Sequence, residues 1–226
     1  MIRKTENIWF SPYNIHYHIQ EAKKLVGGEK FAKDRKWKRA REAHVAMIVA
    51  LGFYRLEKKP AYIQLPKKDP PDAIMMWESQ EKKGEYTMLD LEITSYKSGQ
   101  ETFLEQLKRG KAPEKHIFSS DTSIVFQIQD YEGIDVQNVI DYLSEIDAPF
   151  AIWLILKKQI HPDTIVEFTS IDKYGSKKIS LNIGEALKLF IGEKHSPILH
   201  MERVGNINKV GKSKLPFTHQ KPPWET

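Results

Sequence analysis

The chain contains no cysteine in its 226 residues, which excludes disulfide bonds and metal sites built on thiolates. It also lacks any run of 18 uncharged apolar residues, the length that a membrane-spanning helix requires. The first ten residues, MIRKTENIWF, have no apolar centre of the kind found in secretion signals. We therefore expect a cytoplasmic protein that has no contact with a membrane.

Several chemical signatures are missing as well. There is no phosphate-binding P-loop, no GxGxxG after a predicted strand and no GxSxG nucleophile elbow. These absences give little support to nucleotide hydrolysis, dinucleotide redox chemistry or serine hydrolysis. Among the eight histidines, only His16 and His18 are close in sequence. Without a carboxylate or cysteine partner in range, we interpret this pair as structural or surface residues.

Basic residues are abundant, and they are concentrated near the N-terminus. Lysine and arginine outnumber acidic residues by 35 to 30, and residues 23–41 alone hold nine basic side chains against Glu29 and Asp34. Such a density favours a polyanionic partner. Phe31 and Trp37 lie among these bases and would stack on nucleobases; alternatively, they pin a solvated helix to the core. The residues expected to contact nucleic acid are Lys33, Arg35, Lys36, Lys38, Arg39 and Arg41.

The hydrophobic pattern predicts an α/β fold with a mixed central β-sheet flanked by helices. We expect helices at 18–26, 31–51, 100–109, 134–146 and 183–192, and strands at 73–77, 86–96, 123–130, 150–158 and 164–171. Gly27-Gly28 and Gly52 are expected to end the first two helices, and residues 53–65 to form short strands broken at Pro60. The expected division is a basic helical segment 1–40, an α/β core 41–200 and an extended basic tail 201–226.

One predicted β-hairpin carries an unusual set of acids. Its strands are AIMMW (73–77) and YTMLDLEITSY (86–96), joined by the polar, glycine-bearing ESQEKKG. Side chains alternate along a strand, so Asp90, Glu92 and Thr94 share one face. An unpaired buried charge is costly, so two carboxylates on one face of a buried strand require neutralisation. A metal ion is the simplest candidate.

Asp72 stands at the start of the first hairpin strand, after a Pro-Pro pair that favours extended backbone. A three-residue loop at 82–84 would give paired residues whose numbers sum to 166. Asp72 would then lie opposite Thr94 and diagonal to Glu92, and diagonal neighbours are about 7–8 Å apart. A loop of even length or a single bulge would reverse this parity.

Pro71-Asp72 followed by Glu92-Ile93-Thr94 resembles the PD-(D/E)xK nuclease superfamily, in a variant with Glu-x-Thr where the family usually has Glu-x-Lys. The resemblance covers roughly residues 40–130. It implies a restriction-endonuclease-like αβββαβ core and an endonuclease that uses Mg²⁺ or Mn²⁺ to hydrolyse phosphodiester bonds. It favours DNA over RNA as the substrate.

The resemblance also suggests roles for particular residues. Asp72 and Glu92 would bind the metal, with the main-chain carbonyl of Ile93 as a third ligand. Alternatively, Asp72 caps a turn and Glu92 pairs with a lysine. Asp90 would hold a second ion or act as a solvated acid. Glu42 is placed where some relatives keep an acid facing the metal site, or it is a surface residue of its helix.

Thr94 departs from the family pattern. A lysine at this position orients the attacking water and offsets negative charge, whereas a threonine hydroxyl carries no charge. In families where the lysine has migrated, Lys108 or Lys111 is the better-placed substitute; each is otherwise an ordinary solvated lysine. Gln106 corresponds to a polar residue that some relatives place beside the site.

The expected function is therefore a metal-dependent nuclease. The first alternative is a non-catalytic nucleic-acid-binding module that retains the nuclease fold, with Thr94 marking lost activity. The second is an interaction protein of a mobile-element or defence system that does not touch nucleic acid. Proteins of the superfamily often work as dimers in which each subunit cuts one strand, so a homodimer is compatible with the expected function.

Overall fold

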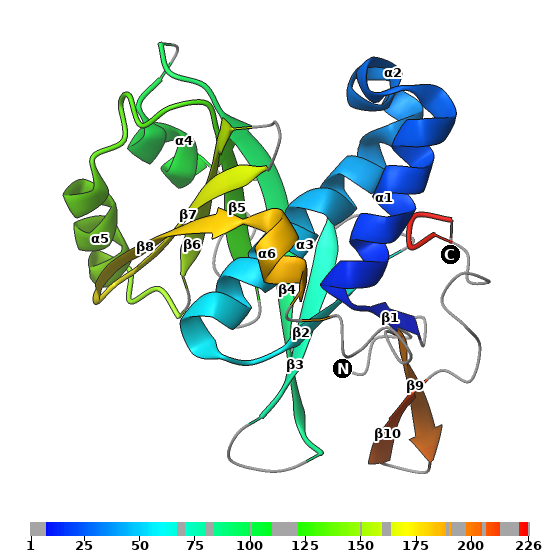
Figure 1. Cartoon of the computed structure of the whole chain (residues 1–226). Helices are drawn as coiled ribbons and strands as arrows, with labels where there is room; N and C mark the ends of the chain where they lie inside the picture. Colours follow the sequence, from blue (N-terminus) through cyan, green and yellow to red (C-terminus); the bar gives the residue numbers. More distant parts are fainter. Residues whose placement is uncertain are drawn as a thin grey trace. The chain divides into compact units, whose positions relative to one another are not determined.

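The computed structural model divides the chain into two compact units, residues 1–88 with 185–226 and residues 89–184 (Figure 1). The residues that the structure describes are 8–66, 71–79, 84–99, 101–109, 122–149, 151–159, 164–188, 190, 198–204, 207–212 and 222–225. Within these ranges no helix is long and apolar enough to cross a membrane.

The first unit begins with a short strand and a well-capped helix. β1 spans Ile8–Phe10 and α1 spans Pro12–Val26. The Ser11 side chain accepts a hydrogen bond from the backbone N–H of Asn14, and the proline that follows it suits the first helical turn. Gly27, with φ of 82°, ends the helix in a conformation that favours glycine. This end is the one that the sequence predicted.

The helix expected over 31–51 is divided into α2 (Gly28–Lys33), the 3₁₀ turn η1 (Arg35–Trp37) and α3 (Lys38–Glu57). Asp34 separates the first two, because its backbone is extended and its carboxylate accepts from the backbone N–H of Lys36 at 2.9 Å. Gly52 does not end α3, contrary to our expectation. The helix continues to Glu57 and is capped by Lys58, which adopts the left-handed conformation. Residues 53–57 are therefore helical rather than extended.

The strands of the first unit are antiparallel, in the order β10-β9-β1-β2-β3. Their bounds are Ala61–Gln64 for β2, Ala73–Glu78 for β3, Ile198–Val204 for β9 and Ile207–Lys212 for β10. The segment 201–226, expected as an extended tail, thus contributes strand residues. Pro223 is buried and Trp224 is half-buried, with the Trp224 ring 6.3 Å from the ring of His18 in α1. Pairing and burial of this segment depend on partners distant in sequence.

The second unit contains a mixed sheet in the order β4-β5-β6-β7-β8. β4 (Tyr86–Tyr96) starts in the first unit; the others are β5 (Thr122–Ile128), β6 (Ile152–Gln159), β7 (Ile165–Asp172) and β8 (Gly175–Asn182). β4, β5 and β6 are parallel, whereas β7 and β8 are antiparallel to their neighbours. The sequence did not predict β8, in which Leu181 is the one buried residue and the others are exposed or half-buried.

Helices α4 (Phe103–Arg109) and α5 (Val136–Glu145) supply apolar side chains to one face of this sheet. Phe103 and Leu107 of α4, and Leu143 of α5, are fully buried in a cluster with alternate residues of β5 and β6. A last helix, α6, spans Ile183–Lys188. The fold class expected from the sequence, an α/β protein with a mixed sheet flanked by helices, is confirmed.

Candidate functional site

The strand β4 carries its acids on one face, as the alternation predicted. Its burial pattern and parallel pairing with β5 place Glu92 beside Ile124 and Thr94 beside Phe126. Ile124 and Phe126 belong to the buried cluster with α4 and α5. Asp90 shares this face and is only 8 % exposed. Asp90 is therefore not the solvated strand-end acid that one interpretation of the sequence allowed.

Asp72 immediately precedes β3 and is 4 % exposed. A buried carboxylate in this position is costly unless other groups stabilise its charge. Asp72 belongs to the first unit, whereas Glu92, Ile93 and Thr94 belong to the second. The expectation that Asp72 and Glu92 share one ion stays a prediction.

The connection between β3 and β4 is closed by backbone pairing. The N–H of Ser79 donates to the carbonyl of Glu85 at 2.7 Å. The N–H of Gly84 donates to a carboxylate oxygen of Glu78 at 2.8 Å. The numbers of Ser79 and Glu85 sum to 164, whereas a loop at 82–84 would have required 166. Both sums are even, so the parity on which the sequence argument depended is kept at this end of the hairpin.

Glu42 is a buried residue of α3. Its side chain is 9 % exposed, and one carboxylate oxygen lies 3.2 Å from the ammonium of Lys38, one helical turn earlier. This excludes the interpretation of Glu42 as a surface residue. The role that the resemblance suggests for Glu42, an acid that faces the metal site, stays a prediction.

The two aromatic residues of the basic segment are part of the core. Phe31 and Trp37 are 3 % and 9 % exposed, and their ring centres are 5.6 Å apart. They hold the basic segment to the rest of the first unit and are too buried to stack on nucleobases. The structure therefore contradicts the stacking interpretation and supports the alternative in which these aromatics anchor the helix.

Two arginines of the segment also have structural partners. Arg41 donates to the carbonyls of Phe31 and Asp34 at 2.9 and 2.8 Å, which ties α3 to the end of α2. Arg39 donates to the carbonyl of Pro66, just after β2. Both side chains are half-buried. Their hydrogen bonds explain their positions without a bound phosphate.

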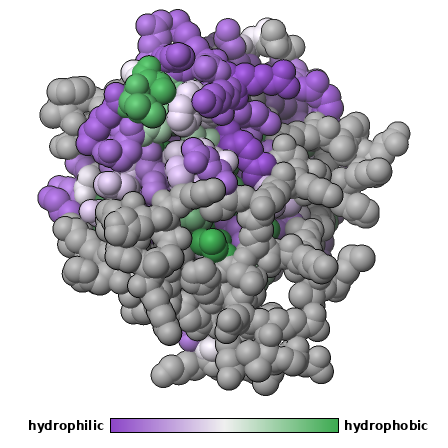
Figure 2. All heavy atoms as spheres, turned by 90° about the vertical axis from the view of Figure 1, so that its right-hand side faces the viewer, coloured by the Kyte–Doolittle hydropathy of each residue, from purple (hydrophilic) through white to green (hydrophobic). Residues whose placement is uncertain are grey.

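The remaining basic residues of the segment are exposed. Lys33 pairs with Glu29 at 2.7 Å, and Lys38 pairs with Glu42. Arg35 and Lys36 are also exposed, and the surface over α1 and α2 is mostly hydrophilic (Figure 2). Fewer residues are thus candidates for phosphate binding than the sequence suggested, and Arg35 and Lys36 are the two that this comparison favours.

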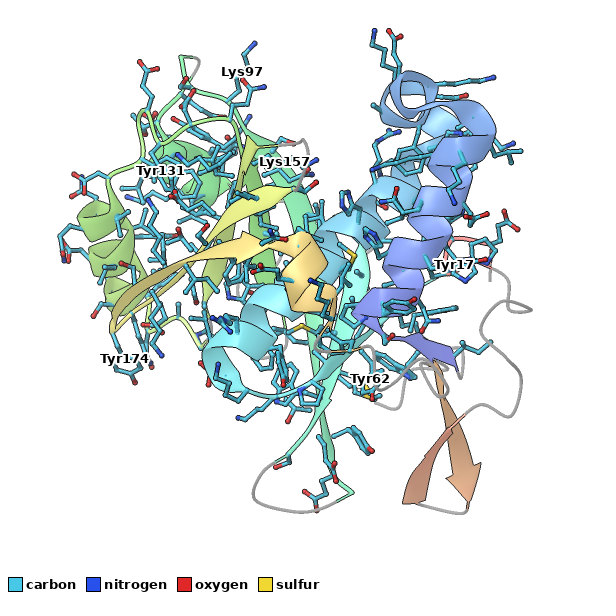
Figure 3. All side chains as sticks on the ribbon, in the orientation of Figure 1. Tyr17, Tyr62, Lys97, Tyr131, Lys157 and Tyr174 are labelled. Carbon is cyan, nitrogen blue, oxygen red and sulfur yellow. The ribbon has the colours of Figure 1, made fainter. Side chains whose placement is uncertain are left out.

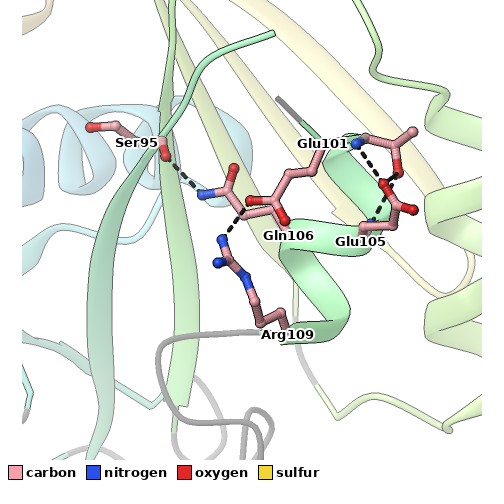
Figure 4. Close-up of polar contacts among 6 residues, drawn as sticks. Ser95, Glu101, Glu105, Gln106 and Arg109 are labelled. Atoms are coloured by element: carbon pink, nitrogen blue, oxygen red, sulfur yellow. Dashed lines mark hydrogen bonds and ion pairs between the residues drawn. The ribbon is translucent and has the colours of Figure 1, made fainter. Parts of the chain in front are cut away.

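Helix α4 uses its polar side chains to attach itself to β4. Gln106 donates to the carbonyl of Ser95 at 2.9 Å (Figure 4). At the start of the helix, Glu105 accepts from the N–H and hydroxyl of Thr102, both at 2.8 Å, and these bonds lower its pKa. Gln106 therefore lies beside the strand that carries Glu92, and its hydrogen bond attaches α4 to β4. Its place beside a metal site stays a prediction.

The ammonium of Lys108 lies 5.0 Å from the ring centre of Tyr142 in α5. This cation–π contact contributes to the packing of α4 against α5. Lys108 as a substitute for the missing lysine stays a prediction, and Lys111 lies outside the described residues.

A polar cluster in the second unit was not expected from the sequence. The Tyr131 hydroxyl lies 2.8 Å from the hydroxyl of Thr169, while Lys178 and Lys158 lie 4.1 and 6.0 Å from the Tyr131 ring centre. Lys178 also pairs with Glu167 at 2.8 Å. Burial opposes charge on Glu167, but hydrogen bonds from Lys178 and Tyr131 outweigh it and lower its pKa. Tyr131 lies between β5 and α5, Lys158 lies in β6, and the other members lie in β7 and β8. Because these segments are separate in the sequence, no local sequence signal could reveal the cluster.

No group of three or more histidine, aspartate or glutamate side chains placed to hold one ion occurs among the described residues. A Mg²⁺ site commonly uses only one or two carboxylates and completes its shell with water and phosphate oxygens. The acids singled out above are therefore enough in number for such a site. Comparison of the chain with protein-family models, curated proteins and solved structures finds no match.

Proposed function

We propose that the protein is a metal-dependent nuclease that cleaves phosphodiester bonds of nucleic acid, DNA in preference to RNA. The order of elements supports this proposal. Along the chain α3 is followed by β2, β3 and β4, then by α4 and β5, with β4 parallel to β5. This is the αβββαβ order that the resemblance implies. Asp72 stands at the start of the second strand of this series, and Glu92 in the third.

In the proposed mechanism, Asp72 and Glu92 would be the carboxylates that hold Mg²⁺ or Mn²⁺. When bound, such an ion would supply an activated water and stabilise negative charge on the phosphate. The carbonyl of Ile93 is the further ligand that the resemblance suggests. Thr94 would position the attacking water by a hydrogen bond but would not supply positive charge. A low rate of cleavage is therefore expected.

The test is cleavage of labelled single- and double-stranded DNA and RNA by the full chain with Mg²⁺ or Mn²⁺. Asp72→Asn and Glu92→Gln preserve side-chain shape and should abolish cleavage, because each removes a charged metal ligand. Glu145→Gln, at an exposed position of α5, should cleave like the wild type. Thr94→Lys should raise the rate, since it adds a cation where charge develops.

The alternative is a non-catalytic nucleic-acid-binding module. It is favoured by the uncharged Thr94 and by the cation–π contact that engages Lys108 with Tyr142. If neither the wild type nor Thr94→Lys cleaves any substrate, and Mg²⁺ or Mn²⁺ does not raise the thermal stability in a manner that depends on Glu92, the nuclease proposal is wrong. Salt-dependent binding of nucleic acid would then identify the binding module.

A further inference from the structure

The tip of the β7–β8 hairpin presents the most exposed large hydrophobic side chain of the described residues. Tyr174 is 87 % exposed, and Figure 3 shows it at the end of the hairpin. Large aromatic side chains are usually at least half-buried, because their apolar surface is costly to hydrate. An aromatic ring left in solvent at the tip of a hairpin is therefore a candidate for contact with a partner.

The backbone beneath this ring is held in place. Asp172 pairs with Gly175, which makes Lys173 and Tyr174 a two-residue turn. A carboxylate oxygen of Asp172 accepts from the N–H of Tyr174 at 2.8 Å. Lys173 forms an ion pair with Asp147, at the end of α5. The turn is thus anchored at both residues, and the ring of Tyr174 is presented on an ordered support.

Lysines gather near the ring, and two of them also pair with acids, Lys173 with Asp147 and Lys178 with Glu167. Residues 173–178, KYGSKK, contain three lysines and no acid. The ammonium of Lys173 lies 5.3 Å from the Tyr174 ring centre. Lys177 and Lys178 are exposed on opposite faces of β8, about 10 and 13 Å from Tyr174 at the rise of a strand. Hydrogen bonding to Glu167 raises the pKa of Lys178, so this ammonium remains charged at neutral pH.

An accessible aromatic ring beside lysines is the combination that binds single-stranded nucleic acid, in which bases stack on the ring and lysines contact the phosphates. A duplex offers no free base face, because its bases are already stacked. We propose that the β7–β8 hairpin is a second nucleic-acid-binding surface, in which Tyr174 stacks on an unpaired base. This inference rests on the proposed function only in taking nucleic acid as the partner. Binding at this surface requires neither a metal nor cleavage.

The experiment measures binding of a fluorescent single strand of about 20 nucleotides, longer than one binding site, and of a duplex of the same sequence by anisotropy, in EDTA. Tyr174→Ala should weaken single-strand binding about tenfold, within the range known for loss of one stacked aromatic, and should change duplex binding by less than about twofold. Tyr174→Phe keeps the ring and should bind like the wild type. Leu25→Ala is the matched control, because Leu25 is 81 % exposed in the other unit.

The lysines give an independent measurement. Lys177→Gln with Lys178→Gln should reduce the slope of log affinity against log salt by roughly 0.7 per lost phosphate contact on a single strand. Unchanged single-strand binding by Tyr174→Ala would overturn the inference and leave a protein partner as the explanation of the exposed ring. Equal losses on single strand and duplex, or a loss in Tyr174→Phe as large as in Tyr174→Ala, would also overturn it. A Tyr174 effect without any cleavage would leave this inference standing while the nuclease proposal fails.

Discussion

The junction between Gly133 and Tyr96 offers a sharp test of how β4 is held. Gly133 precedes α5 and has φ of 73°, a conformation that L-residues with a Cβ rarely adopt. A Cβ added there would lie 2.5 Å from the hydroxyl oxygen of Tyr96, the last residue of β4. This hydroxyl itself donates to the carbonyl of Glu132 at 3.2 Å. Gly133→Ala should therefore both strain the backbone and displace a buried tyrosine.

The expected cost can be separated into two parts. The positive φ alone costs about 1–2 kcal/mol in an alanine, partly offset by about 0.4–1 kcal/mol because alanine restricts the unfolded chain. Displacing the Tyr96 hydroxyl adds roughly 1–3 kcal/mol of overpacking. We expect Gly133→Ala to lower the free energy of unfolding by about 1–5 kcal/mol, the sum of these terms. Gly99→Ala is the control, because Gly99 has φ of 97° and a Cβ added to it would meet no atom within 4 Å.

The double variant Gly133→Ala with Tyr96→Phe tests the contact directly. Without the hydroxyl, the nearest tyrosine atom is the ring carbon at 3.8 Å, an ordinary van der Waals distance. The second substitution should therefore restore much of the overpacking term, roughly 1–3 kcal/mol. Urea denaturation with hydrogen exchange of the second unit gives both free energies. If Gly133→Ala is no less stable than Gly99→Ala, the proposed contact with Tyr96 is refuted.

Two further predictions concern the first unit. Replacing the exposed Arg35 and Lys36 with glutamine should reduce the slope of log duplex affinity against log salt by roughly 0.9 per lost phosphate contact. Arg55→Gln, an exposed control in the last turn of α3, should leave this slope unchanged. An unchanged slope in the Arg35 and Lys36 variant would mean that the basic segment is only a solvated surface. Burial lowers the pKa of both His16 and His18, so the unfolded chain binds protons more readily than the folded chain. The contribution of these histidines to the free energy of unfolding should therefore be fully present above about pH 6.5 and decline as the pH falls below it. Replacing both histidines with glutamine should remove this part of the decline in pH-dependent denaturation of the first unit, and an identical decline in the variant would contradict the reasoning.

Local patterns in the sequence determined much of the secondary structure. The strand predicted over 86–96 is present with the same bounds, and Gly27 ends α1 as expected. Alternation placed Asp90, Glu92 and Thr94 on one face of β4, because a strand allows only two directions for its side chains. These features depend on neighbours within a few residues, so a single sequence contains the information needed to predict them.

Where the sequence predicted the wrong secondary structure, tertiary packing outweighed the local sequence pattern. Gly52 indicated a helix end, but it is buried and the helix continues to Glu57. β8 has few apolar residues, and it is a strand because each of its residues pairs with β7. Strand β9 likewise pairs with β1, which lies near the opposite end of the chain, and β10 pairs with β9. Periodicity cannot report such pairing, because it depends on distant partners.

For the candidate site, the sequence was enough to single out the unusual acids. Only the tertiary structure determined how deeply these acids are buried and which groups they contact. Charge density alone made residues 30–41 appear to be a uniform basic surface. Packing buried Phe31 and Trp37 and gave Arg41 backbone partners, which leaves a smaller exposed set. Conversely, the exposed ring of Tyr174 could not be recognised before its turn was placed, because burial is a property of the folded chain and not of the residue type.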